Sequence, residues 1–95
     1  MSKGYLVAHL NVYDKKGFEK FRQMADPTIA EYGGTVIVRE PNPDIREGKN
    51  LGIALIIEFE NIETARKFYK PEEYQVAKAV RELASNTHLI LVEGS

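Results

Sequence analysis

The segment from residue 53 to residue 75, IALIIEFENIETARKFYKPEEYQ, constrains the fold of this chain most narrowly. Its opening run is almost wholly apolar and predicts a central β-strand. Asn61 follows as a helix cap, and Pro71 marks the point where a second helix begins. A buried strand that leads into two successive helices is typical of an α+β domain. Glu58, an acid inside that strand, is the first candidate for a functional group.

Alternation and helical spacing outline the remaining elements. Residues 5–13 alternate between an apolar row and a mixed row, which predicts a strand with one face on the core. A helix is expected from the cap at Asp14 to residue 32, with Pro27 interrupting it and Asp26 capping its restart. Further strands are expected over 35–40, 51–59 and 87–93, and a long polar loop over 41–50.

The elements follow the order β-α-β-β-α-β. With right-handed crossovers, this order predicts a ferredoxin-like α+β fold: a four-stranded antiparallel sheet of order 4-1-3-2 with both helical segments on one face. The 95 residues suit one domain, 1–95. Helical spacing predicts that the last helix turns these residues towards the core: Val76, Ala77, Val80, Leu83 and Ala84.

The sheet face that the helices leave open is too apolar to be left in water. Strand parity places on it, beside apolar residues, the polar side chains of His9, Asn11, Arg39 and Glu58. A second copy of the chain is the simplest cover. Two sheets packed face to face would form a dimeric α/β barrel, so we expect a homodimer through this face.

Composition and motifs exclude several classes of function. The chain has no cysteine, and its two histidines form no HxH or HExxH motif, so we predict no metal site. The net charge of −1 gives no basic face for nucleic acid. The RNA-recognition motif shares this element order, but Ile53 and Leu55 stand where its stacking aromatic residues belong. No cofactor, membrane span or signal segment is indicated, and the cytoplasm is the expected location.

Short motifs along nearly the whole chain resemble one family. They are GYLVAH near the start, EYGG before the second strand, IIEF, ARKFY-x-x-EEYQ-x-A and the terminal LVEG. Together they are similar to the DUF1330 family, small proteins of unassigned function. The resemblance implies the dimeric α/β-barrel fold and a homodimer, and it implies no reaction. The loop at 41–50 is individual to this chain, which leaves any ligand preference open.

Glu58 and His9 are the candidate catalytic residues. A carboxylate desolvated beside an apolar strand could act as a general base with a raised pKa, or it could be a paired acid that fixes the dimer. His9 could transfer protons near neutral pH, or it could form a hydrogen bond inside a dimer core. Strand register separates the two residues within one chain, so a shared site would need a partner subunit.

Four more residues are candidates for ligand binding: Asn11, Arg39, Tyr69 and Tyr74. Arg39, together with Arg46 and Lys49 of the long loop, could hold a carboxylate or a phosphate, or could be a solvated charge at a strand end. Tyr69 and Tyr74 flank the break between the last two helices. They could line a pocket between helix and sheet, or pack as core aromatics.

Two functions of different classes fit these observations. The first is a homodimeric protein that binds a small organic metabolite between sheet and helices, in one version as a cofactor-independent enzyme of the monooxygenase or isomerase type. If it is an enzyme, we expect Glu58→Gln to abolish activity and leave the dimer intact. The second is a non-catalytic dimeric module for binding or interaction. A perturbed acid or base in a closed pocket would favour catalysis.

Overall fold

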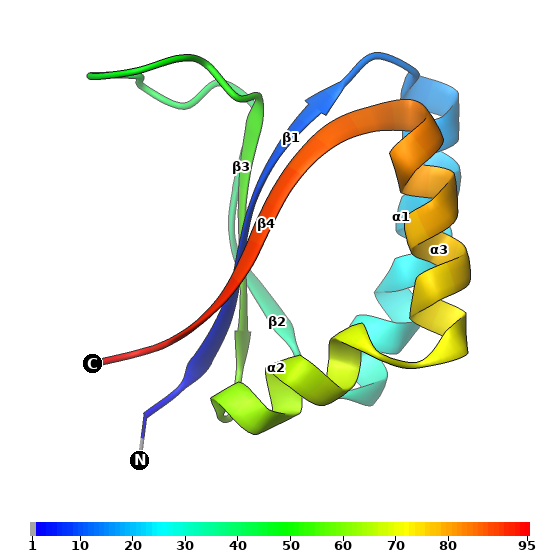
Figure 1. The fold of residues 1–95 in the computed structure, drawn as a ribbon, viewed down its shortest axis with the longest axis vertical. Coiled ribbons are helices and arrows are strands. Elements are labelled where there is room, and N and C mark those ends of the chain that lie inside the picture. Colours follow the sequence, from blue (N-terminus) through cyan, green and yellow to red (C-terminus); the bar gives the residue numbers. More distant parts are fainter. Residues whose placement is uncertain (1) are drawn as a thin grey trace.

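A four-stranded antiparallel sheet forms one layer of the protein, and three helices form the other (Figure 1). The computed structural model describes residues 2–95. In chain order the elements are β1 (Gly4–Val12), α1 (Lys15–Glu31), β2 (Thr35–Glu40), β3 (Ile53–Phe59), α2 (Ile62–Tyr69), α3 (Glu72–Ala84) and β4 (Ser85–Glu93). The strand order is β2-β3-β1-β4. Read from the other edge, this is the predicted order 4-1-3-2, and the ferredoxin-like α+β fold is confirmed.

The two helix caps that the sequence predicts are present. The Asp14 carboxylate accepts a hydrogen bond of 3.1 Å from the backbone N–H of Gly17 at the start of α1. The Asn61 side chain accepts one of 2.8 Å from the N–H of Thr64 at the start of α2. Each cap satisfies a backbone N–H that the first turn of a helix leaves without a partner. The caps therefore fix where the chain leaves the sheet layer.

Pro27 does not interrupt α1, contrary to the prediction, and the helix runs unbroken from Lys15 to Glu31. Proline lacks an N–H, so the carbonyl of Gln23 loses its usual partner in the helix. Gln23 and Pro27 are both exposed, so water can hydrate that carbonyl. A proline on the solvent side of a helix costs less stability than one that faces a core. The packing of the helix outweighs that cost.

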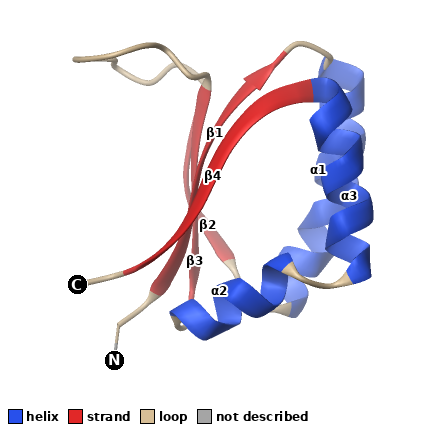
Figure 2. Ribbon diagram, viewed as in Figure 1, coloured by secondary structure: helices blue, strands red, loops and turns tan. Residues whose placement is uncertain are grey.

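The core lies between the two layers and is centred on aromatic rings near α2. The ring of Phe68 packs 5.2 Å from that of Phe59 and 4.7 Å from that of Tyr74. Leu6 and Ile57 of the sheet are each 2 % exposed beside them. Figure 2 shows α1 and α3 standing off from the sheet, with α2 joining the two layers at one end. This arrangement positions the cavity described below.

A β-bulge in β2 moves Arg39 to the opposite face of the sheet from the one predicted. Val36 is level with Ile57 of β3, but Val38 is level with Ile56, so Ile37 is an extra residue. An extra residue reverses the alternation of side chains after it. Arg39 therefore lies level with Leu55, on the face that the helices cover. Its assignment to the open face is wrong because simple parity assumes a regular strand.

The buried face of α3 also differs from the predicted one. Leu83 is 81 % exposed and Val76 is 48 % exposed, although both were expected to face the core. The buried residues of the helix are Tyr74, Ala77, Arg81 and Ala84. Their spacing of three and four residues forms one helical stripe, and that stripe includes an arginine. The sequence prediction took only apolar residues as the inward face, so the predicted face of the helix is rotated relative to the observed one.

Candidate functional site

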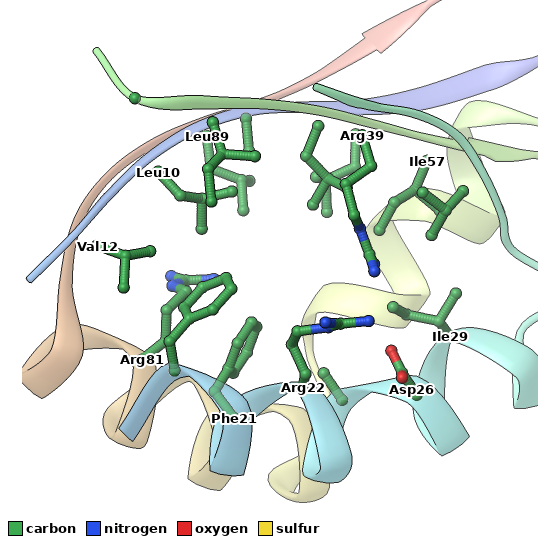
Figure 3. Close-up of a pocket in the computed structure, with 18 of the residues that line it drawn as sticks. Leu10, Val12, Phe21, Arg22, Asp26, Ile29, Arg39, Ile57, Arg81 and Leu89 are labelled. Atoms are coloured by element: carbon green, nitrogen blue, oxygen red, sulfur yellow. The ribbon is translucent and has the colours of Figure 1, made fainter. Parts of the chain in front are cut away.

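A cavity of about 540 Å³ lies between the sheet and helices α1 and α3 (Figure 3). Leu10, Leu55 and Leu89 are among the residues of its sheet wall, and Phe21, Ala25 and Ile29 are among those of its helix wall. The walls are mostly apolar. A volume of this size accommodates a small organic molecule.

Three arginine side chains reach this cavity from three different elements: Arg22 from α1, Arg39 from β2 and Arg81 from α3 (Figure 3). Arg22 and Arg39 extend from opposite walls towards the end where Asp26 lies, whereas Arg81 lies beside Phe21. The charged lining comprises four cationic side chains and two carboxylates: Lys15 and the three arginines against Glu19 and Asp26. The cavity therefore carries an excess of positive charge.

Arg81 is the most deeply buried of these charges, at 4 % exposure. Its Nη1 donates a hydrogen bond of 2.7 Å to the hydroxyl of Tyr74, and its guanidinium lies 5.5 Å from the ring centroid of Phe21. Its Nε has no hydrogen-bond partner among the described residues. No carboxylate in residues 2–95 lies within 4.0 Å of it. A buried cation without a counter-ion is costly, and an anion in the cavity would offset that cost.

Tyr74 presents a neutral hydroxyl beside Arg81. Desolvation by burial raises the pKa of Tyr74 above its ordinary value, and the nearby Arg81 acts in the opposite direction without cancelling the rise. The phenol is therefore protonated at neutral pH. Because its oxygen accepts the bond from Arg81, its hydrogen is left for another acceptor.

Three of the predicted ligand-binding residues border the cavity: Asn11, Arg39 and Tyr74. Asn11 keeps the regular alternation of β1 and is exposed, so only Arg39 has changed face relative to the prediction. Tyr69 is not among the lining residues of the described chain. Its ring packs 5.2 Å from that of Tyr74, and the ammonium of Lys78 lies 5.6 Å from its centroid. Tyr69 therefore supports Tyr74 from behind. The ligand-binding roles of all four residues stay predictions.

His9 and Glu58 lie on the open face of the sheet and do not line the cavity. His9 is level with Ala54 on β3 and with His88 on β4. Glu58 accepts a hydrogen bond of 3.2 Å from the hydroxyl of Tyr5. Desolvation, and then this bond to a carboxylate, raise the pKa of Tyr5. The two predicted catalytic residues are separated within one chain, as expected, and their roles stay predictions.

Apolar side chains surround these polar groups on the open face. Val7 is level with Ile56 on one neighbouring strand and with Ile90 on the other. Ile90 is 57 % exposed. None of the described helices covers this face (Figure 2). The expected apolar surface is therefore present in the isolated chain.

Sequence reasoning missed Arg22 and Arg81. The signal that could have found Arg81 is its position in the stripe formed by Tyr74, Ala77 and Ala84, where an apolar residue belongs. Arg22 follows Phe18 by four residues and so shares its side of α1. An arginine on the apolar side of an amphipathic helix indicates either an ion pair in the core or a ligand site.

The described residues contain neither a cluster of metal-ligating side chains nor a membrane-spanning helix. Between residues 2 and 95, no three histidine, aspartate or glutamate side chains gather as a metal ion would require. No helix in that range has the length and apolar composition of a membrane span. The cytoplasmic location stays a prediction.

The fold and the cavity define a ferredoxin-like α+β protein with room for a small molecule between its layers. The chain belongs to the family described as "Domain of unknown function (DUF1330)", which it matches over residues 3–95. None of the curated proteins matches the chain. The resemblance seen in the sequence motifs is thereby confirmed.

Solved structures with the same fold are distant in sequence. A protein of unknown function from Rhodopseudomonas palustris has a TM-score of 0.78 and 12 % identity, covering 96 % of this chain and 81 % of its own. A dimeric ferredoxin-like protein of unknown function from Bacteroides fragilis has a TM-score of 0.62 and 14 % identity, covering 96 % and 95 %. SnoaB, a cofactor-independent oxygenase from Streptomyces nogalater, has a TM-score of 0.67 and 13 % identity, covering 97 % and 92 %. These similarities show the fold alone.

Proposed function

We propose that this protein is a homodimer that binds a small organic molecule in the cavity between its sheet and helices α1 and α3. The observation that carries the proposal is the cavity itself, about 540 Å³ with apolar walls and a few convergent polar groups. This combination is the usual form of a small-molecule site. The polar groups would orient the molecule, and the apolar walls would supply most of the affinity.

The cavity opens to solvent, because its lining includes the exposed residues Asp26 and Arg39. A small molecule can therefore enter it. The apolar walls at Leu10, Leu55 and Leu89 would then be covered by that molecule instead of by water, which favours binding.

The open face supports the dimer in this proposal. Val7, Ile56 and Ile90 form an apolar surface that no described helix covers. The Bacteroides fragilis neighbour, which has the same fold, is dimeric. A second copy on this face would leave the cavity of each protomer free, because the cavity lies on the other side of the sheet.

A neutral fluorescent probe tests the cavity. N-phenyl-1-naphthylamine should bind saturably, with one site per protomer. Leu89→Trp places a larger ring in the cavity and should weaken binding at least about tenfold. Leu83→Trp is the matched control, since Leu83 is 81 % exposed on α3, and it should bind as the wild type does. Circular dichroism checks that both variants fold. Wild-type affinity in Leu89→Trp, or no saturable binding, would contradict the proposal.

A second candidate function is cofactor-independent catalysis, with His9 and Glu58 as its acid and base. The supporting observation is that Glu58 accepts a hydrogen bond from the hydroxyl of Tyr5 on a face that the proposed dimer would close to water. The SnoaB neighbour supports only the fold. The alternative to catalysis is the non-catalytic binding module.

Native mass spectrometry of the gently purified protein tests this second candidate. If the wild-type dimer consumes the molecule that co-purifies with it, Glu58→Gln should stop that turnover at unchanged dimer mass. Turnover retained by Glu58→Gln would remove Glu58 from the mechanism. A co-purified molecule that stays intact on the wild-type protein would favour the non-catalytic module.

A further inference from the structure

We propose that the ligand of this cavity is a monoanionic carboxylic acid with a compact apolar body, and that its carboxylate binds to Arg81 and Tyr74. The inference rests on the proposed function and names the class of molecule that the site takes. It is carried by the burial of Arg81, by the geometry of its hydrogen bonds and by the lack of a counter-ion among residues 2–95.

Arg81 and the Tyr74 hydroxyl bonded to it have only donors left for a ligand. Arg81 has no acceptor atom, and its buried Nε–H has no partner within residues 2–95. The Tyr74 oxygen is occupied by the bond from Arg81, which leaves its O–H as a donor. A group that complements them must accept hydrogen bonds, and beside a buried guanidinium it gains most if it is negatively charged.

The chemistry of the guanidinium favours a planar carboxylate. Nη1 of Arg81 donates to Tyr74, and its buried Nε has no hydrogen-bond partner within residues 2–95. A guanidinium is planar and carries its N–H groups in a fixed fork, which matches the two oxygens of a carboxylate. A phosphate monoester would bring a second charge into walls that are mostly apolar and would lose more of its hydration.

One anionic group on the ligand is enough to pair with the buried charge of the cavity. Arg22 already pairs with Glu19, at 3.6 Å between Nη1 and Oε2. Arg39 is exposed, so water can solvate its charge. Arg81 is the only arginine of the cavity that is both buried and without a carboxylate in the described chain. The leucine and phenylalanine walls then select an apolar body for the rest of the ligand.

The experiment compares two probes of the same shape, 2-naphthoate and 2-naphthamide, by calorimetry on the dimer. Wild-type protein should bind the carboxylate at least about tenfold more tightly than the carboxamide. Arg81→Met, which keeps the length and removes the charge, should bring this ratio close to one. Arg66→Met is the matched control, because Arg66 lies exposed on α2 in an ion pair with Glu63, and it should keep the wild-type ratio.

Thermal melting distinguishes a ligand-binding arginine from one that only stabilises the fold. Removing a buried cation that lacks a counter-ion should raise the melting temperature of ligand-free Arg81→Met above that of the wild type. At the same time, 2-naphthoate should stabilise the wild type and not the variant. If Arg81→Met does not fold, Tyr74→Phe carries the test. It keeps the ring, removes one donor and should weaken 2-naphthoate several-fold more than 2-naphthamide.

The outcomes separate this inference from the proposed function. Equal binding of the two probes to the wild type, or an unchanged ratio in Arg81→Met, would overturn the carboxylate assignment. Tighter binding of 2-naphthyl phosphate than of 2-naphthoate would overturn it too. In each of these cases, saturable binding of N-phenyl-1-naphthylamine would leave the cavity proposal standing. If none of the probes binds, both proposals fail.

Discussion

The two faces of β1 carry similar apolar residues but obtain their cover from different sources. Leu6, Ala8 and Leu10 are 2–3 % exposed beneath the helices of the same chain. Val7 and His9, which alternate with them, are only half-buried, because none of the described helices reaches the other side. Alternation in a sequence therefore shows that both faces need cover, and it does not show whether the chain itself supplies that cover.

The polar groups of the two faces differ in chemistry as well. On the helix side, Arg81 donates to Tyr74 beside a cavity, and the Nε of Arg81 finds no acceptor within residues 2–95. On the open side, Glu58 already has Tyr5 as its partner. A set of donors without an acceptor indicates a ligand, whereas a satisfied pair fits an interface. The comparison thus supports the proposed ligand site on one face and the proposed association through the other.

The largest effect that this comparison predicts is on folding through the helix side. Phe68→Ala should lower the free energy of unfolding by about 3–5 kcal/mol, since it removes a 1 %-exposed ring from the aromatic centre of the core. Urea denaturation at one fixed protein concentration measures this. Leu83→Ala on α3 is the control and should change the value by less than about 0.5 kcal/mol. Equal effects in the two variants would mean that the core has been misplaced.

The next effect concerns association through the open side. Ile56→Asp should weaken the dimer more than about 100-fold, because it would bury a carboxylate without a partner in the interface. Sedimentation velocity should then show a folded monomer at micromolar concentration. Glu58→Gln, a change on the same strand and face, should leave the dimer intact. A dimer that persists in Ile56→Asp would show that another surface mediates association.

Local patterns were enough to predict the fold, and the site was only partly predictable. The caps at Asp14 and Asn61 and the order of the elements follow from side-chain chemistry within a few residues. The bulge at Ile37 does not, because an irregular strand is stabilised by its neighbour β3. Strand parity could therefore not predict that Arg39 lies on the cavity side of the sheet. Arg81 was missed for a different reason: the predicted stripe of α3 contained only apolar residues, whereas the buried stripe contains Tyr74 and Arg81.

A smaller effect tests the close approach of β1 to the start of β3, in the sheet that both faces share. Gly52 has a φ of +100°, and an added Cβ would collide with the backbone carbonyl of Leu10 on β1. Gly48 has a φ of +84° with open space around it. The backbone strain of about 1–3 kcal/mol is expected in both alanine variants, but only Gly52→Ala adds the collision. Urea denaturation should rank Gly52→Ala as clearly the less stable. The reverse order would mean that β1 and β3 separate at this end.

The smallest effect is on stability at high pH, where Tyr74 of the helix side is compared with Tyr5 of the open side. The pKa of Tyr74 is raised mainly by burial, and that of Tyr5 by desolvation and by Glu58. A phenol with a raised pKa in the folded protein contributes stability that is complete below its unfolded pKa of about 10 and is lost as the pH rises through the folded value. Wild-type stability should therefore fall above about pH 10.

Tyr74→Phe should flatten this alkaline decline more than Tyr5→Phe does, because water screens the half-buried Tyr5 and does not reach Tyr74 as easily. Melting temperatures of the three proteins between about pH 8 and pH 11 measure the difference, and the comparison of variants removes the common effect of lysine deprotonation. Equal slopes in the two variants would show that Tyr74 is as well solvated as Tyr5. In that case, the cavity end at Arg81 would be open to water, and the need of that arginine for an anionic ligand would be correspondingly weaker.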